Sequence, residues 1–94
     1  MPYAVEYTAE AEADLDAMPP LVASFTLDEI DRLAADPVGL GGPSYFPFLP
    51  NRQMFETRYD GSEGTYFLRV FFRYQPDEAT ITVLAIGAQS LGGA

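Results

Sequence analysis

The sequence predicts a small α+β domain in which an antiparallel sheet carries an N-terminal helical hairpin on one face. Two stretches of the first half have the apolar spacing of amphipathic helices, and three stretches of the second half alternate as strands do. Short turns separate these three strands, so we expect them to be antiparallel. The chain has 94 residues, the length of one domain, and we expect residues 1–94 to form a single domain in the order β-α-α-β-β-β.

The first half begins with a short strand and continues with two helices. Residues 3–7 alternate in polarity, and Thr8 follows in the position of a helix cap. The pair Pro19-Pro20 ends the first helix, and the second is expected to run from Pro20 to Ala35. Seven side chains of the second helix fall in one arc that should face the core: Val22, Ala23, Thr26, Leu27, Ile30, Leu33 and Ala34.

Residues 37–50 contain four prolines and three glycines, which predicts a loop. The loop is rich in large apolar side chains, namely Leu40, Tyr45, Phe46, Phe48 and Leu49. A long apolar loop either packs over an edge of its own core or has a function of its own, and we favour packing.

Three strands are expected after this loop, at residues 53–59, 65–75 and 80–86. The turn sequence of residues 60–64 separates the first two, and Pro76-Asp77 ends the second. Small residues dominate the end of the chain, so we expect residues 88–94 to form a flexible tail.

The net charge is −9, from 14 acidic residues against five arginines and no lysine. This balance argues against a general nucleic-acid binder, whose affinity depends on neutralising phosphates. The charges are unevenly distributed. Residues 1–36 carry nine acids and one arginine, whereas residues 37–94 carry five acids and four arginines. The cations therefore belong to the C-terminal part of the chain.

The chain contains neither cysteine nor histidine. Disulfides and thiolate metal sites are thereby excluded, and the commonest general base and metal ligand is missing. We expect no metal ion and no cofactor. No apolar run approaches the length of a membrane span, and the first six residues lack the basic start of a signal peptide. We expect a cytoplasmic protein that makes no membrane contact.

The strand expected at residues 65–75 has two different faces. One face is purely apolar and should pack on the helices: Tyr66, Leu68, Val70, Phe72 and Tyr74. The other alternates phenylalanine with arginine, and no remaining element is left to cover it: Phe67, Arg69, Phe71 and Arg73. In the preceding strand, Met54, Glu56 and Arg58 share one side.

This open face has two interpretations. In the first, Arg58, Arg69 and Arg73 bind phosphates, the phenylalanine rings stack on unpaired bases, and Glu56 serves as the general base. In the second, it is an exposed sheet face with cross-strand Arg–Glu pairs, each of which contributes little free energy. Spacing alone favours the second interpretation.

Four stretches, taken together, resemble the RelE/ParE family of bacterial toxins. Residues 3–19 (YAVEYTAEAEADLDAMP) resemble its opening, which is a strand, a capping residue, Ala-x-x-Asp-Leu and Met-Pro. Residues 33–37 (LAADP) are similar to the end of its second helix. Residues 66–72 (YFLRVFF) and 81–87 (ITVLAIG) resemble its two C-terminal strands. Their order and spacing carry the resemblance, which covers most of the chain.

The resemblance implies a toxin of a type II toxin–antitoxin pair. It implies a cognate antitoxin as partner. It also implies that the chain forms either a homodimer or a heterotetramer with the antitoxin. RelE-type members are metal-independent endonucleases that cleave ribosome-bound mRNA, and ParE-type members poison DNA gyrase. In this sequence Arg69 falls on the arginine that stabilises the scissile phosphate in the nuclease branch. Arg58 falls near the basic position of the preceding strand, and Glu56 lies where some members place a catalytic carboxylate.

The chain departs from the family pattern after its final Ile-Gly. The family usually places basic or histidine residues there and then a tyrosine, whereas residues 88–94 supply none of these. The lysines with which such toxins dock on ribosomal RNA are absent as well. Two functions stay open. One is an mRNA endonuclease, and the other is a non-catalytic interaction protein, either a gyrase inhibitor or a toxin that only binds its antitoxin.

Leu21 and Phe25 lie off the core-facing arc of the second helix, one turn apart. Either residues 40–49 fold back and cover this pair, or the pair forms a docking surface for an antitoxin helix or a second copy of the chain.

Overall fold

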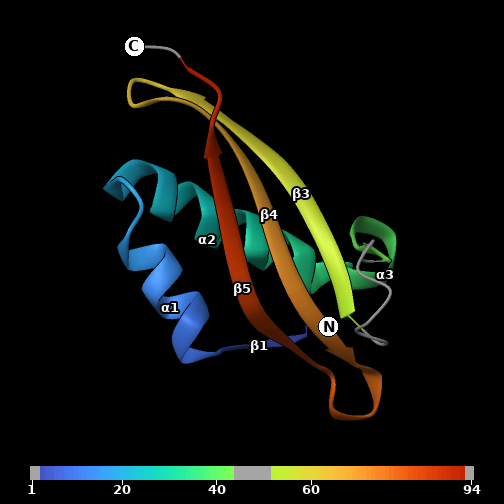
Figure 1. The fold of residues 1–94 in the computed structure, drawn as a ribbon. Helices are drawn as coiled ribbons and strands as arrows, with labels where there is room; N and C mark the ends of the chain where they lie inside the picture. The colour runs from blue at the N-terminus through green and yellow to red at the C-terminus, as the bar shows by residue number, and fades with distance from the viewer. Residues whose placement is uncertain (1–2, 44–51, 93–94) are drawn as a thin grey trace.

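The computed structural model describes residues 3–43 and 52–92. These residues form helices and strands in the expected order, with one short helix and one short strand in addition (Figure 1). The elements are β1 (Ala4–Tyr7), α1 (Ala9–Asp16), α2 (Pro20–Ala35), α3 (Pro37–Leu40), β2 (Gly42–Pro43), β3 (Arg52–Gly61), β4 (Gly64–Gln75) and β5 (Thr80–Ser90), with one 3₁₀ turn, η1 (Pro76–Glu78), between β4 and β5. No helix in the described part of the chain is long and apolar enough to cross a membrane.

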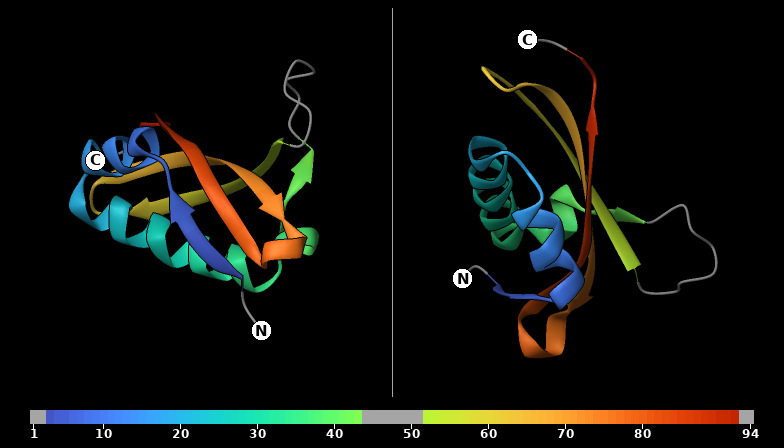
Figure 2. Two further views of the ribbon diagram at one scale, coloured as in Figure 1. Left: turned by 90° about the horizontal axis from the view of Figure 1, so that it is seen from below. Right: turned by 60° about the vertical axis from the view of Figure 1, so that its left-hand side comes forward.

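The strands form one sheet in the order β1-β5-β4-β3-β2. As predicted, β3, β4 and β5 are antiparallel neighbours joined by short connections. The strand β1 pairs with β5 in parallel, so the sheet is mixed rather than wholly antiparallel. A parallel pair needs a long crossover connection, and here the intervening helices and strands supply it. The predicted α+β class is confirmed, with α1 and α2 on one side of the sheet (Figure 2, right).

The helix α1 is fastened to the outer edge of β5 at both of its ends. Thr8 caps the helix by accepting a hydrogen bond from the Ala11 amide at 3.2 Å. The same hydroxyl donates to the Leu84 carbonyl oxygen at 2.8 Å. One and a half turns later, Asp14 Oδ2 accepts from the Ile86 amide at 2.9 Å. These bonds satisfy backbone groups of β5 in the region that β1 does not reach.

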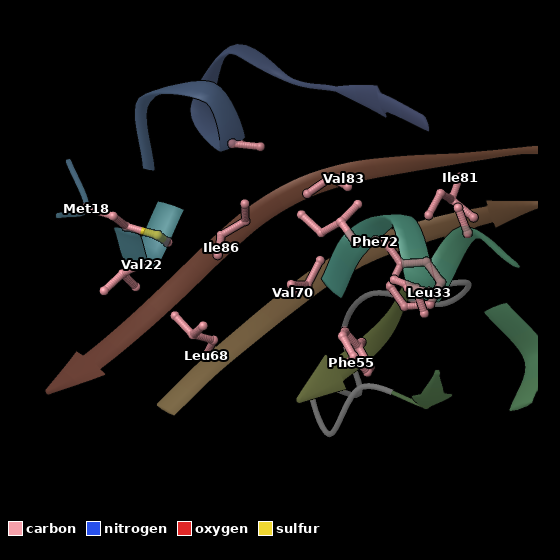
Figure 3. Close-up of a cluster of buried hydrophobic side chains, with 13 residues drawn as sticks. Met18, Val22, Leu33, Phe55, Leu68, Val70, Phe72, Ile81, Val83 and Ile86 are labelled. Atoms are coloured by element: carbon pink, nitrogen blue, oxygen red, sulfur yellow. The ribbon is translucent and has the colours of Figure 1, made fainter. Parts of the chain in front are cut away.

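The core lies between the helices and the apolar face of the sheet (Figure 3). Its largest fully buried side chains come from α2, β4 and β5: Phe72, Ile30, Leu33, Leu68, Ile81, Val22, Val70, Val83 and Thr26. The apolar face predicted for β4 is therefore confirmed. Leu27, at the border of the arc predicted for α2, is exposed instead of buried. The sheet therefore covers a narrower part of the α2 surface than the core-facing arc predicted from the sequence.

The segment expected to be a loop, residues 37–50, begins with the short helix α3 and the short strand β2. Leu40 packs against the core, as the packing interpretation requires. Gly41 approaches the sheet so closely that a Cβ atom there would lie 2.6 Å from the Phe72 ring, so no other residue fits without rearrangement. The other apolar residues of the segment (Tyr45, Phe46, Phe48 and Leu49) lie outside the described residues.

The strand β5 is longer than predicted and contains a bulge. It continues to Ser90 and pairs with β4 along its whole length, so residues 88–90 belong to the sheet and not to a flexible tail. Leu84 is an extra residue in this pairing, because Phe71 lies opposite Ala85 while Phe72 lies opposite Val83. Beyond the bulge, Ile86 faces the core and Gly87 lies opposite Arg69 on the other face.

Glu29 accepts three hydrogen bonds, two from Arg32 of its own helix and one from Thr57, which connects α2 to β3. Its carboxylate accepts from Arg32 Nε at 2.8 Å, from Arg32 Nη2 at 3.1 Å and from Thr57 Oγ1 at 2.6 Å. The Arg32 guanidinium lies 5.5 Å from the centre of the Phe55 ring. The bonds from Arg32, and then that from Thr57, lower the pKa of Glu29 below its ordinary value of 4.5.

We expect Glu29→Gln to destabilise the folded chain by about 1 kcal/mol at neutral pH, because Gln cannot carry the charge that these donors stabilise. Since the folded-state pKa is lowered, the contribution of Glu29 is complete above its unfolded-state pKa and is lost as the pH falls through the folded-state pKa. The gap between wild type and variant in urea unfolding should therefore close in acid. A gap that stayed constant with pH, or an equal loss in the exposed control Glu78→Gln, would contradict this account.

Candidate nucleic-acid interface

The sheet has an open face that no helix of the described chain covers (Figure 2, right). On β4 the buried residues Leu68 and Val70 alternate with Arg69, which is exposed. Arg73 is exposed on the same face, and Phe67 and Phe71 are half-buried there. The structure thus brings the predicted arginines and phenylalanines of this strand to one surface.

Arg69 lies at the centre of this face and is loosely held. Its Nε donates to Glu56 Oε2, directly across on β3, at 3.4 Å. This distance is longer than usual for a charge-assisted hydrogen bond, and the two side chains are 51% and 41% exposed. The Arg69 guanidinium also lies 5.1 Å from the centre of the Phe67 ring. Breaking an exposed, weak ion pair costs little free energy, so Arg69 can exchange Glu56 for an incoming phosphate.

The other arginines of the open face are placed differently. Arg58 lies opposite Phe67, but its Nε donates to Asp60 Oδ2 of its own strand at 3.1 Å, so the side chain turns towards the β3–β4 turn. Asp60 also accepts from Thr65 Oγ1 at 2.7 Å. The bonds from Thr65 and then from Arg58 lower the pKa of Asp60. Arg73 lies further along β4, opposite Thr82, and makes no ion pair with any described residue.

A hollow of about 160 Å³ opens beside Arg69. Its walls are formed by Phe67, Arg69, Gly87, Ala88 and Gln89. The residues from β5 were missed in the sequence because the strand was expected to end at Ile86. The spacing of its apolar residues, Ile81, Val83 and then Ile86, carried the information, since a step of three inside a strand indicates a bulge.

The residues predicted for partner binding lie on the opposite side of the molecule, on α2. Leu21 is 56% exposed, whereas Phe25 is half-buried, with its ring 5.3 Å from that of Tyr59 in an edge-on arrangement. The two therefore do not form an exposed pair, and the cover over Phe25 comes from β3. A second hollow, of about 500 Å³, lies beside the α1–α2 turn and is lined by Asp14, Ala17, Met18, Pro19, Tyr66, Ile86 and Ala88.

Comparison with solved structures identifies the architecture as the RelE-like fold. The toxin–antitoxin complex RelBE2 from Mycobacterium tuberculosis matches with a TM-score of 0.75 at 20% identity, over 95% of this chain and 100% of that one. The intact E. coli RelBE toxin–antitoxin complex matches with a TM-score of 0.66 at 10% identity, over 90% and 94%. The isolated E. coli RelE toxin matches with a TM-score of 0.65 at 11% identity, over 96% and 87%.

No protein-family model matches the sequence, and no curated protein does. The likeness therefore lies in the fold.

Proposed function

We propose that this chain is the toxin of a type II toxin–antitoxin pair that acts in the cytoplasm on single-stranded RNA, as a metal-independent endonuclease. The observation that carries the proposal is the exposed Arg69 at the centre of the open face, beside Phe67, on a RelE-like fold. Arginine holds phosphate with a fixed fork of donors, and aromatic rings accept unpaired bases. The structures that share the fold are described as toxin RelE and as toxin–antitoxin complexes.

The distribution of charge supports an RNA site on this face in spite of the net charge of −9. Eight of the nine acids of residues 1–36 belong to α1, α2 and the residue that caps α3, on the helical side of the sheet, whereas Glu6 of β1 lies beside Thr82 on the open face. On the open face, three arginines (Arg58, Arg69, Arg73) stand against three acids (Glu6, Glu56, Asp60), so the described charges of this face balance while those of the helical side are strongly negative. In the proposed reaction Arg69 stabilises the negative charge that develops on the scissile phosphate.

A non-catalytic role on the same fold is the second candidate. The observation in its favour is that Glu56 already neutralises Arg69 and that the described residues of the open face include no group suited to protonate a leaving oxygen. Such a chain would bind its antitoxin, or a target such as gyrase, without cleaving RNA.

Arg69→Ala should abolish growth arrest when the chain is expressed in bacteria, and mRNA cleavage mapped by primer extension should disappear. The side chain is half exposed, so the free energy of unfolding should change by less than about 1 kcal/mol. Arg32→Ala is the matched control, because it removes the same charge from the helical side. A toxic Arg69→Ala, or an equal loss in the control, would remove Arg69 from the proposed site.

Glu56→Gln separates the two roles that this carboxylate can have. If Glu56 is the counter-ion of Arg69, the change should tighten binding of a labelled single-stranded RNA about fivefold, because it removes a negative charge next to the phosphate. If Glu56 is the general base, binding should change little while single-turnover cleavage falls sharply. The ion pair that Glu56 forms with Arg69, directly across the two strands, favours the counter-ion. Asp77→Asn, away from the face, controls for net charge.

Leu21→Asp and Phe25→Asp test whether α2 docks a partner such as the cognate antitoxin. Leu21→Asp should leave the melting temperature unchanged, because the side chain is exposed, yet should separate the complex on size-exclusion chromatography. Phe25→Asp should cost about 2–4 kcal/mol of stability, since it places a charge against Tyr59. The chain would be co-expressed with its proposed cognate antitoxin. An intact complex in Leu21→Asp would exclude this part of α2 from the interface.

A further inference from the structure

We propose that Gln89 reads the base of the nucleotide whose phosphate Arg69 holds, and that it favours adenine. The inference rests on the proposed RNA-binding function of the open face and names its specificity-determining residue. It is carried by the hollow beside Arg69, whose lining combines a cation, an aromatic ring, a bare backbone and one amide side chain.

The bulge in β5 places the hollow on the open face. Without the extra residue Leu84, the side-chain alternation would turn Gly87 and Gln89 towards the helices. With it, Gly87 lies directly opposite Arg69, and Gln89 lies directly opposite Phe67. Residues that face each other across an antiparallel pair are close neighbours, so a group bound by Arg69 lies within reach of the Gln89 side chain.

Gly87 forms the floor of the hollow. A Cβ atom added there would meet no other atom within 4 Å, so the space above the backbone is open. The Phe67 ring, with the Arg69 guanidinium against it, forms one wall. Both an aromatic ring and a guanidinium plane stack on nucleobases, and a floor without a side chain lets a flat base approach the sheet.

Among the described residues that line the hollow, Gln89 supplies the one uncharged hydrogen-bonding side chain. The residue is exposed, and its side-chain amide makes no hydrogen bond within the described part of the chain. An amide offers a donor and an acceptor side by side, which matches the N7 acceptor and the N6 donor of adenine. Guanine presents two acceptors at the same edge and would leave the amide oxygen opposed by another oxygen.

The test measures binding of short oligouridines that carry one central adenine, guanine, cytosine or uracil. The central nucleotide is 2′-O-methylated so that it cannot be cleaved, and binding is followed by fluorescence anisotropy at constant salt. The wild-type chain should bind the adenine oligomer roughly tenfold more tightly than the uracil oligomer, as expected for one bidentate base contact. Gln89→Leu should reduce this preference to less than about twofold, through a loss of affinity for the adenine oligomer.

Two further variants make the test specific. Gly87→Val directs a side chain into the open space of the hollow and should weaken adenine binding without loss of stability, because valine suits a strand. Gln75→Leu is the matched control. Gln75 lies at the opposite end of β4, where its side chain accepts a hydrogen bond from Thr82, and its loss should leave the adenine preference intact.

The failure of this inference is distinguishable from the failure of the proposed function. If all four oligomers bind equally, if another base is preferred, or if Gln89→Leu keeps the preference, Gln89 does not read adenine. The phosphate site then still stands, provided that Arg69→Ala weakens binding of every oligomer. If the wild-type chain binds none of the oligomers, or if Arg69→Ala binds them unchanged, both the RNA site and the base contact are overturned.

Discussion

The composition of the open face depends on one extra residue in β5. Leu84 interrupts the pairing with β4, and every residue after it is turned to the opposite face. The bulge is held from outside by α1, because Thr8 donates to the Leu84 carbonyl oxygen and Asp14 accepts from the Ile86 amide. The beginning of the chain therefore determines which side chains near its end stand beside Arg69.

Local patterns were sufficient to predict the elements whose stability is local. The limits of α2, from Pro20 to Ala35, follow from the prolines at either end, and the buried face of β4 follows from its alternation. Residues 87–90 were missed because Gly, Ala, Gln and Ser have little strand propensity of their own. They form a strand because β4, which is twelve residues long, provides hydrogen-bonding partners for their backbone groups. The parallel pairing of β1 with β5 joins residues more than seventy positions apart, and no local sequence pattern predicts it.

The sequence was sufficient to predict which residues lie at the candidate site, but not which of them form ion pairs with one another. Alternation alone placed Glu56, Arg58 and Arg69 on one surface, and the register puts Glu56 opposite Arg69. Arg58 instead turns to Asp60, a choice that depends on Thr65 and on the geometry of the turn. The sequence left open whether Phe25 is covered, and offered only residues 40–49 as the cover, because a helical wheel describes one helix by itself. Tyr59 covers Phe25, and because it belongs to a strand far along the chain, a helical wheel of α2 does not include it.

The layered arrangement also bears on how an acidic chain could bind RNA. In the helical layer eight acids stand against Arg32 alone among the described residues, so a nucleic acid is repelled from that side and its approach to the open face is oriented as well as weakened. The same field attracts basic partners to the helices, where Leu21 is exposed. Under the proposed function, toxin target and antitoxin would thus be sorted to opposite faces by charge. The ion pair of Glu56 with Arg69 lowers the affinity of the open face for phosphate. A phosphate then binds there only when neighbouring contacts, such as that of a base with Gln89, add to the binding free energy.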